Sequence, residues 1–277
     1  MPAINAISPE KLLRLIGTPQ CPAIIDVREE EAFAKDRAMI PSGCRRDAAE
    51  LVSRSAGFEG RDAVVLCEDG ATVSPGVAAW LRHENVSAEI LEGGMKAWRD
   101  AALPCVPQSR LPQRDPLGRT IWVTRARPKV DRIACPWLIR RFVDPHAVFL
   151  YVAPSEVLSV AGRFGAAAYD IEGDNVLWSH RGAFCTFDTM VDELGLAGFA
   201  GLARLRTIVR GADTGRPDLA PEAAGLLAAS LGLSRMFGDD LEQLEAGMSI
   251  YDAFYRWCRD ATDETHNWTS HRPKSQR

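Results

Sequence analysis

The chain has 277 residues with 33 basic and 37 acidic side chains, and its formal net charge is -4. Hydrophobic residues make up 46% and charged residues 25%, a globular composition that excludes wholesale disorder. The charge excludes a polycation that coats nucleic acid, and no apolar run reaches the roughly 18 residues of a transmembrane helix.

At about 150 residues per domain, this length predicts two domains. The seven cysteines are scattered and never spaced C-x-x-C, which indicates neither a disulfide framework nor a zinc finger. Residues 1–17 lack the basic and apolar segments of a secretory signal. We therefore expect a reduced, cytoplasmic protein with no membrane partner.

Strand-like and helix-like segments alternate through the first hundred residues. Ser8 is a good N-cap for a helix that starts at Pro9. Apolar runs predict strands at residues 23–27, 62–67 and 88–91. Amphipathic segments predict helices at residues 29–35, 76–84 and 93–98. This alternation is typical of an α/β domain with a parallel sheet and helices on both faces.

Residues 103–118 contain four prolines and almost no apolar periodicity, which predicts a stiff, extended linker. We divide the chain into a first domain, a proline-rich linker, a second domain and a frayed tail, at residues 1–108, 109–119, 120–262 and 263–277. Strands are predicted at residues 120–124, 148–152, 167–171 and 175–179. Helices are predicted at residues 130–142, 155–164, 186–194, 202–211, 221–231 and 239–259. An α+β domain that ends in several helices follows from this order.

Cys67 ends the strand-like run at residues 62–67, and a five-residue loop follows it: Glu68, Asp69, Gly70, Ala71 and Thr72. A thiol between a strand and a helix faces backbone N–H groups, which stabilise a thiolate or a persulfide. We predict that Cys67 is catalytic and that residues 68–72 form its active-site loop. The two acidic neighbours are expected to raise the thiol pKa and to repel thiosulfate, so a docking module without turnover is the alternative.

This half of the chain resembles a rhodanese domain. The matching segments are Ile25-Asp26-Val27-Arg28, Ile40-Pro41-Ser42-Gly43, Cys67 with its loop, and Gly93-Gly94-Met95-Lys96-Ala97-Trp98. The resemblance implies a rhodanese fold and a sulfurtransferase that takes sulfur from a sulfane sulfur donor. We expect Arg28 to be a buried partner that orients Asp26 or the active-site loop, and not a substrate ligand.

A basic segment opens the second half, where residues 110–141 hold nine basic and two acidic side chains. A predicted strand delivers basic side chains to the start of a helix, where guanidinium groups and free N–H groups bind oxyanions. We predict that four residues bind a small inorganic anion: Arg125, Arg127, Lys129 and Arg132. Contact with a DNA backbone is the alternative, although no helix-turn-helix signature accompanies the basic segment.

One imidazole and two carboxylates stand at element ends in the second half. His180 precedes a glycine turn, Asp188 lies in the first turn of a predicted helix, and Asp213 follows another helix. Such donors suit iron, manganese or zinc, so we predict a divalent metal site there and no nucleotide cofactor. Asp131, Asp218 and Glu222 are further ligand candidates. A hairpin-end histidine, a helix-dipole carboxylate and a turn aspartate are the simpler interpretations.

Residues 121–259 resemble the ChrB type of chromate-resistance family, most specifically in residues 127–142 and in the segment from His180 to Asp188. Some members carry a rhodanese domain ahead of this one. The resemblance implies a role in chromate resistance, as an accessory protein or as a chromate-responsive regulator. Our hypothesis is a metal-binding protein of oxyanion or redox-stress detoxification in which Cys67 passes sulfane sulfur; a DNA-binding regulator and a non-catalytic scaffold are the alternatives.

Overall fold

The alternating segments of the first hundred residues form a parallel five-stranded sheet in the computed structural model, which describes residues 5–53, 62–173 and 176–264. In spatial order the strands are β1 (Ala6–Ile7), β6 (Ser87–Leu91), β5 (Asp62–Leu66), β2 (Ala23–Asp26) and β4 (Gly43–Arg45). The helices are α1 (Pro9–Leu15), α2 (Glu30–Lys35), α3 (Ala48–Ser53), α4 (Ser74–His83) and α5 (Gly94–Asp100). The predicted α/β class is confirmed, and Ser8 caps α1 by accepting the Lys11 N–H at 3.4 Å.

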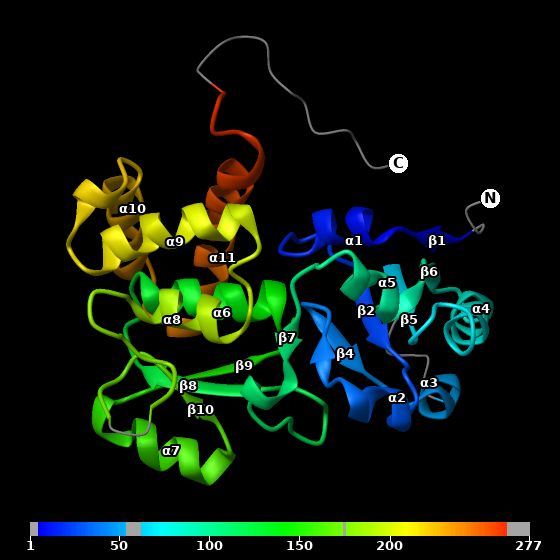
Figure 1. Cartoon of the computed structure of the whole chain (residues 1–277). Coiled ribbons are helices and arrows are strands. Elements are labelled where there is room, and N and C mark those ends of the chain that lie inside the picture. The colour runs from blue at the N-terminus through cyan, green and yellow to red at the C-terminus, as the bar shows by residue number, and fades with distance from the viewer. Residues whose placement is uncertain (1–4, 54–61, 174–175, 265–277) are drawn as a thin grey trace.

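The second half builds a smaller parallel sheet with helices packed beside it (Figure 1). Its strands, in spatial order, are β10 (Ala167–Ala168), β8 (Ile121–Arg125) and β9 (Val148–Val152). Its helices are α6 (Asp131–Phe142), α7 (Val157–Phe164), α8 (Thr186–Glu193), α9 (Ala200–Asp213), α10 (Ala223–Met236) and α11 (Asp240–Asp260). A strand-containing opening and a helical close confirm the predicted α+β class. Among the described residues no helix is long and apolar enough to cross a membrane.

Two predictions for this region are wrong in part. The strand expected at residues 167–171 ends at Ala168, because Asp170 adopts a left-handed conformation with φ 52° that extended chain cannot continue. The strand expected at residues 175–179 is reduced to one isolated bridge, Trp178 to Tyr169. Residue 175, the first of this predicted strand, lies outside the described residues. Residues 265–277 of the predicted tail lie outside them as well.

The proline-rich segment contains paired and turn structure. β7 (Val106–Pro107) pairs antiparallel with β3 (Ala38–Met39) of the first region. Further on, the Asp115 carboxylate closes a turn by accepting the N–H groups of Leu117 at 2.9 Å and Arg119 at 2.8 Å. Backbone pairing and a carboxylate-closed turn therefore give this segment defined structure.

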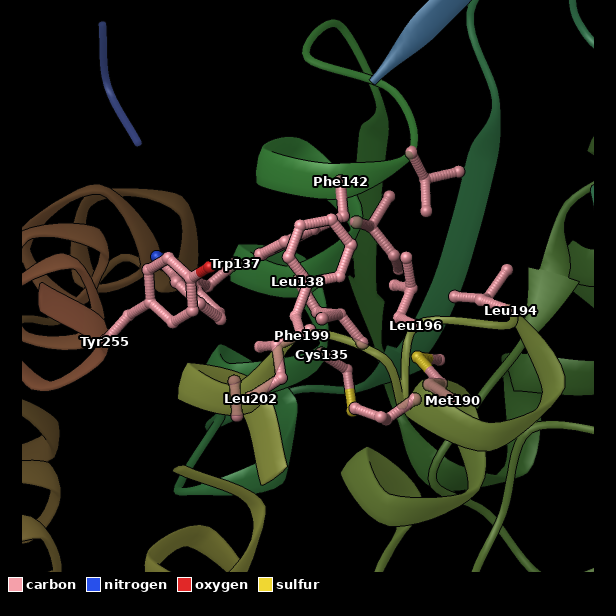
Figure 2. Close-up of a cluster of buried hydrophobic side chains, with 14 of the residues drawn as sticks. Cys135, Trp137, Leu138, Phe142, Met190, Leu194, Leu196, Phe199, Leu202 and Tyr255 are labelled. Carbon is pink, nitrogen blue, oxygen red and sulfur yellow. The ribbon is translucent and has the colours of Figure 1, made fainter. Parts of the chain in front are cut away.

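One hydrophobic core runs through both regions. Phe142 and Trp137 from α6 meet Tyr255 from α11 in its centre, with ring centroids 5.4–5.8 Å apart (Figure 2). Gly17, which follows α1, reaches this cluster so closely that a Cβ there would overlap the Phe142 ring. The Ser42 N–H also donates to the Phe142 carbonyl at 2.6 Å. The two regions therefore pack as parts of one folded unit.

Candidate functional site

Cys67 follows β5 at the carboxyl edge of the first sheet, where a parallel sheet gathers its functional loops. Its Sγ lies 3.2 Å from the Ser74 Oγ and 3.3 Å from the Asp69 Oδ1. The Asp69 carboxylate closes the loop by accepting the N–H groups of Ala71 and Thr72, both at 2.9 Å, and the Thr72 hydroxyl at 2.5 Å. The predicted loop thus wraps around the thiol.

The charge balance at the thiol differs from the prediction. Burial raises the pKa of Cys67, but hydrogen bonds from the Ser74 hydroxyl and from the N–H groups of Ser74 and Val73 outweigh burial and Asp69. The pKa of Cys67 is therefore below its ordinary value, and the expectation of a raised pKa is wrong. Glu68 is turned away into an ion pair with Arg99, so only one of the two acidic neighbours faces the sulfur.

Helix α5 holds this loop in place. Gly94 has φ 60°, and a Cβ at this position would overlap the Cys67 carbonyl oxygen. The Met95 N–H donates to that same carbonyl at 2.9 Å. Arg28 lies elsewhere, buried, with its guanidinium 2.6 Å from the Asp26 carboxylate. This pairing confirms the predicted orienting role of Arg28.

The second cluster surrounds His180. Its Nε2 lies 3.3 Å from the Asp213 Oδ2, 3.4 Å from the Asp170 Oδ1 and 3.7 Å from the Asp131 Oδ2. Asp131 begins α6, Asp170 follows β10, and Asp213 ends α9. Ligand atoms of Asp131, Asp170 and His180 all fall within 4.8 Å of one another, a spacing that can hold a metal ion.

Local hydrogen bonds hold these carboxylates in place. Asp131 Oδ2 accepts the N–H groups of Thr186 at 2.6 Å and Phe187 at 3.3 Å, where α8 begins. The Thr186 hydroxyl donates to Asp170 at 3.0 Å. The Asp131 N–H points at the Asp213 Oδ1 from 3.4 Å. The starts of α6 and α8 thus both face the cluster, and the positive ends of their dipoles favour negative charge there.

Asp131 has an oxygen atom without a partner, whereas Arg125 and Arg132 both contact the carboxylate of Asp170. Asp131 is 1% exposed, and its Oδ1 is buried without a hydrogen-bond partner. Burial, together with the charges of Asp213 and Asp170, raises the pKa of Asp131 well above its usual range. Hydrogen bonds to Asp170 and Asp213 raise the pKa of His180 to about 10. A buried carboxylate oxygen with no partner is costly, and a cation placed beside it removes that cost.

The predicted metal ligands are only partly brought together. His180 and Asp213 meet, and Asp131, a further candidate, joins them. Asp188 lies apart: it is fully buried, ion-paired with Arg206 at 2.8 Å and Arg210 at 3.5 Å. It also accepts the Cys185 N–H in a capping box at the start of α8.

The two other candidate ligands have different surroundings from Asp131. Asp218 pairs with the exposed Arg216 at 2.7 Å, and Glu222 stands as N-cap of α10. Asp170 is absent from the predicted ligands because the sequence predicts a continuous strand there. Its place after a parallel strand is the signal that points to it, since ligands bind at the carboxyl ends of such strands.

The four predicted anion-binding residues divide into two pairs. Arg125 and Arg132 contact Asp170 at 3.1 and 3.2 Å, so they support the carboxylate cluster. Arg127 and Lys129 line a separate pocket near α10. The basic segment is therefore shared between two places, and no single anion contacts all four side chains in this arrangement.

Comparisons with known proteins agree with both halves. Residues 122–258 match the family model of the ChrB C-terminal domain, and residues 8–101 match the rhodanese-like domain. Protein ChrB of Cupriavidus metallidurans is 34% identical over 148 residues, which are 52% of this chain and 43% of that protein. The chain therefore spans less than half the length of this curated relative.

Solved structures resemble the first region. A rhodanese-related protein from Thermoplasma volcanium is 20% identical, with a TM-score of 0.33, and the match covers 37% of this chain and 98% of that one. A rhodanese-like domain protein from Staphylococcus aureus is 24% identical, with a TM-score of 0.31, and the match covers 34% of this chain and 91% of that one.

Proposed function

Since residues 8–101 are a rhodanese-like domain and residues 122–258 a ChrB C-terminal domain, we propose that the chain is a chromate-resistance protein that binds a divalent metal. The ligands are His180, Asp131, Asp170 and Asp213. This set keeps His180 and Asp213 of the sequence prediction and replaces Asp188 with two carboxylates that face the imidazole.

The unpartnered Oδ1 of Asp131 carries this proposal. Three carboxylates and one imidazole suit manganese or iron better than zinc, whose closed structural sites use mostly thiolate and imidazole. The His180 side chain is 43% exposed, so the cluster is open to solvent on the imidazole side. A metal held there would supply a positive charge that attracts an oxyanion and polarises its bonds.

The rhodanese-like domain supplies the second part of the proposal, a persulfide on Cys67. The Cys67 thiolate attacks the outer sulfur of thiosulfate, the sulfur–sulfur bond of the donor breaks, and sulfite leaves with the bonding electron pair. Cyanide then takes the outer sulfur as thiocyanate and returns the thiolate. The lowered pKa of Cys67 and the N–H groups at the start of α4 favour the anionic forms in both steps.

Elemental analysis of the purified full-length protein tests the metal site. We expect about one equivalent of manganese or iron in the wild type and a large loss of that metal in His180→Ala. Asp218→Asn, which changes an exposed carboxylate paired with the nearby Arg216, is the matched control and should keep the metal. Equal metal content in wild type and His180→Ala would remove the proposed site.

A thiosulfate–cyanide assay tests the sulfur step independently. Cys67→Ala should abolish thiocyanate formation, because no other residue in this loop can carry the sulfane sulfur. Cys44→Ala, which changes a partly buried cysteine outside the loop, serves as control and should retain activity. If Cys67→Ala formed thiocyanate at the wild-type rate, Cys67 would not be the sulfur carrier.

A further inference from the structure

A cationic pocket of about 560 Å³ lies beside the C-terminal end of α10. Its lining residues are Arg127, Lys129, Leu231, Gly232, Ser234 and Arg235. Three of them are basic and none is acidic. The pocket shares no residue with the carboxylate cluster around His180, so a ligand bound here would not depend on the proposed metal.

Two of the three cations in this pocket have no counter-charge among the described residues. Within the described part of the chain, the side chains of Lys129 and Arg235 form neither an ion pair nor a hydrogen bond. Arg127 donates to the carbonyls of Ser234 and Phe237, at 2.5 and 3.1 Å, and no carboxylate touches its guanidinium. Clustered cations without counter-charges repel one another, and a multiply charged anion relieves that repulsion.

The backbone that presents Arg127 is strained. Its φ is 59°, in the left-handed region, and Pro128 follows it, which disfavours helical conformations at the preceding residue. Asp240 holds the strained residue by accepting its N–H at 3.0 Å. Non-glycine residues fixed in such conformations gather at ligand sites, and here the strained backbone and the carbonyls at the end of α10 together fix the position of Arg127 at the pocket.

We propose that this pocket binds a small organic phosphate. Guanidinium and ammonium groups together recognise phosphate oxygens. The volume far exceeds that of a bare oxyanion and falls in the range of small-molecule sites, about 300–1,000 Å³. Leu231, 44% exposed, provides an apolar wall for the organic part of the ligand.

Isothermal titration calorimetry of the full-length protein tests this proposal, with chelator present so that no metal bridges the ligand to the His180 cluster. The probes are adenosine diphosphate, inorganic phosphate and adenosine. We expect the diphosphate to bind most tightly, inorganic phosphate more weakly and adenosine not measurably. Arg235→Glu and Lys129→Glu should each weaken diphosphate binding by about tenfold or more.

Arg163→Glu is the control, because Arg163 in α7 lies outside the pocket lining, is exposed and has no ion-pair partner among the described residues. It should leave the affinity unchanged, and circular dichroism should show that all three variants fold. The proposal would be overturned by equal affinity for diphosphate and inorganic phosphate, or by equal weakening in Arg163→Glu and Arg235→Glu. Binding of a DNA duplex without binding of the diphosphate would overturn it as well.

Discussion

The pKa of the Cys67 thiol is lowered by groups that donate hydrogen bonds directly to its sulfur. Ser74 contributes both its hydroxyl, 3.2 Å from the sulfur, and its backbone N–H. Removing the hydroxyl leaves only the N–H groups of Ser74 and Val73 to stabilise the thiolate against burial and Asp69, which both favour the neutral thiol. The Ser74 hydroxyl is therefore the largest of the contributions that lower the pKa of Cys67.

We therefore predict that Ser74→Ala raises the pKa of Cys67 toward or above the usual value of about 8.5. Because a thiol gains its charge as pH rises, the wild type should form thiolate at lower pH than the variant. Sulfur transfer in the wild type should accordingly persist to lower pH. The ultraviolet absorbance of the thiolate, taken as the difference from Cys67→Ala, measures both midpoints. Ser159→Ala in α7 should match the wild type; coincident midpoints for wild type and Ser74→Ala would contradict the assignment.

A candidate site residue can be predicted from sequence when its residue type is rare. It cannot be predicted when its role depends on which charged side chain it pairs with in the fold. His180 is one of five histidines, so its place before a glycine turn is informative. Aspartates are common, and sequence alone does not show whether a carboxylate faces a cation. Asp188 and Asp213 are both aspartates at the ends of predicted helices, yet Arg206 pairs with Asp188, whereas Asp213 faces His180.

This difference between the two aspartates predicts separate outcomes for Asp188→Asn. The variant leaves Arg206 and Arg210 beside a buried neutral amide, which should cost about 3 kcal/mol in the free energy of unfolding. Its metal content should equal that of the wild type. Urea unfolding and elemental analysis measure the two effects. Asp192→Asn removes the exposed partner of the same arginine and should cost less than about 1 kcal/mol; metal loss in Asp188→Asn would restore Asp188 as a ligand.

At the scale of elements, the start of α5 sets the shape of the loop at residues 68–72. Its first residue, Gly94, packs directly against backbone atoms of Cys67 and Gly70, which cannot move aside as a flexible side chain can. The Lys96 N–H further donates to the Glu68 carbonyl at 2.9 Å. The loop is therefore shaped as much by α5 as by its own residues.

We predict that Gly94→Ala destabilises the protein by more than about 1 kcal/mol and slows sulfur transfer. The added Cβ would overlap the Cys67 oxygen and lie 2.5 Å from the Gly70 nitrogen, so the loop must shift. Thermal unfolding and the thiosulfate–cyanide assay measure both effects. Gly76→Ala in α4 meets nothing within 4 Å and should be neutral or stabilising by up to about 1 kcal/mol. A Gly94→Ala variant as stable and active as the wild type would show that the contact does not matter.

Elements can be predicted from sequence where a segment is long enough to show a period. The helices from α6 to α11 each span two turns or more, and their predicted bounds lie within two residues of the observed ones except at the end of α10, which continues five residues past the predicted 231. The strands β1, β3 and β7 hold two residues each and are not predicted, because two residues display no alternation. These short strands form because they pair with strands that are distant in sequence.

At the scale of the whole molecule, the proline-rich segment separates two regions of different composition, but the hydrophobic core continues across it. Gly17 and Ser42 of the first region both contact Phe142 of the second, and the Arg259 guanidinium donates to the Arg14 carbonyl at 2.9 Å. These contacts join residues that are far apart in the chain, so no local sequence pattern predicts them. The proline-rich segment predicts two domains, but it cannot predict that they share a core.

Because the two regions share a core, we predict that truncation of Phe142 destabilises both of them. Phe142→Ala removes a fully buried ring that packs on Tyr255 and Phe199, which should cost about 3–5 kcal/mol. Hydrogen exchange in increasing denaturant then compares amides of β5 in the first region with amides of α6 in the second. Both sets should lose protection together, and at lower denaturant than in the wild type, because unfolding of one region exposes the core of the other.

Phe164→Ala is the matched control for this prediction, since Phe164 in α7 is 55% exposed and its truncation removes little buried surface. It should leave the exchange of β5 and α6 amides near that of the wild type. If β5 kept its wild-type protection in Phe142→Ala while α6 lost it, the two regions would unfold independently. The interface at Gly17 and Ser42 would then be a contact between stable domains, and the rhodanese-like region could be varied without regard to the proposed metal site.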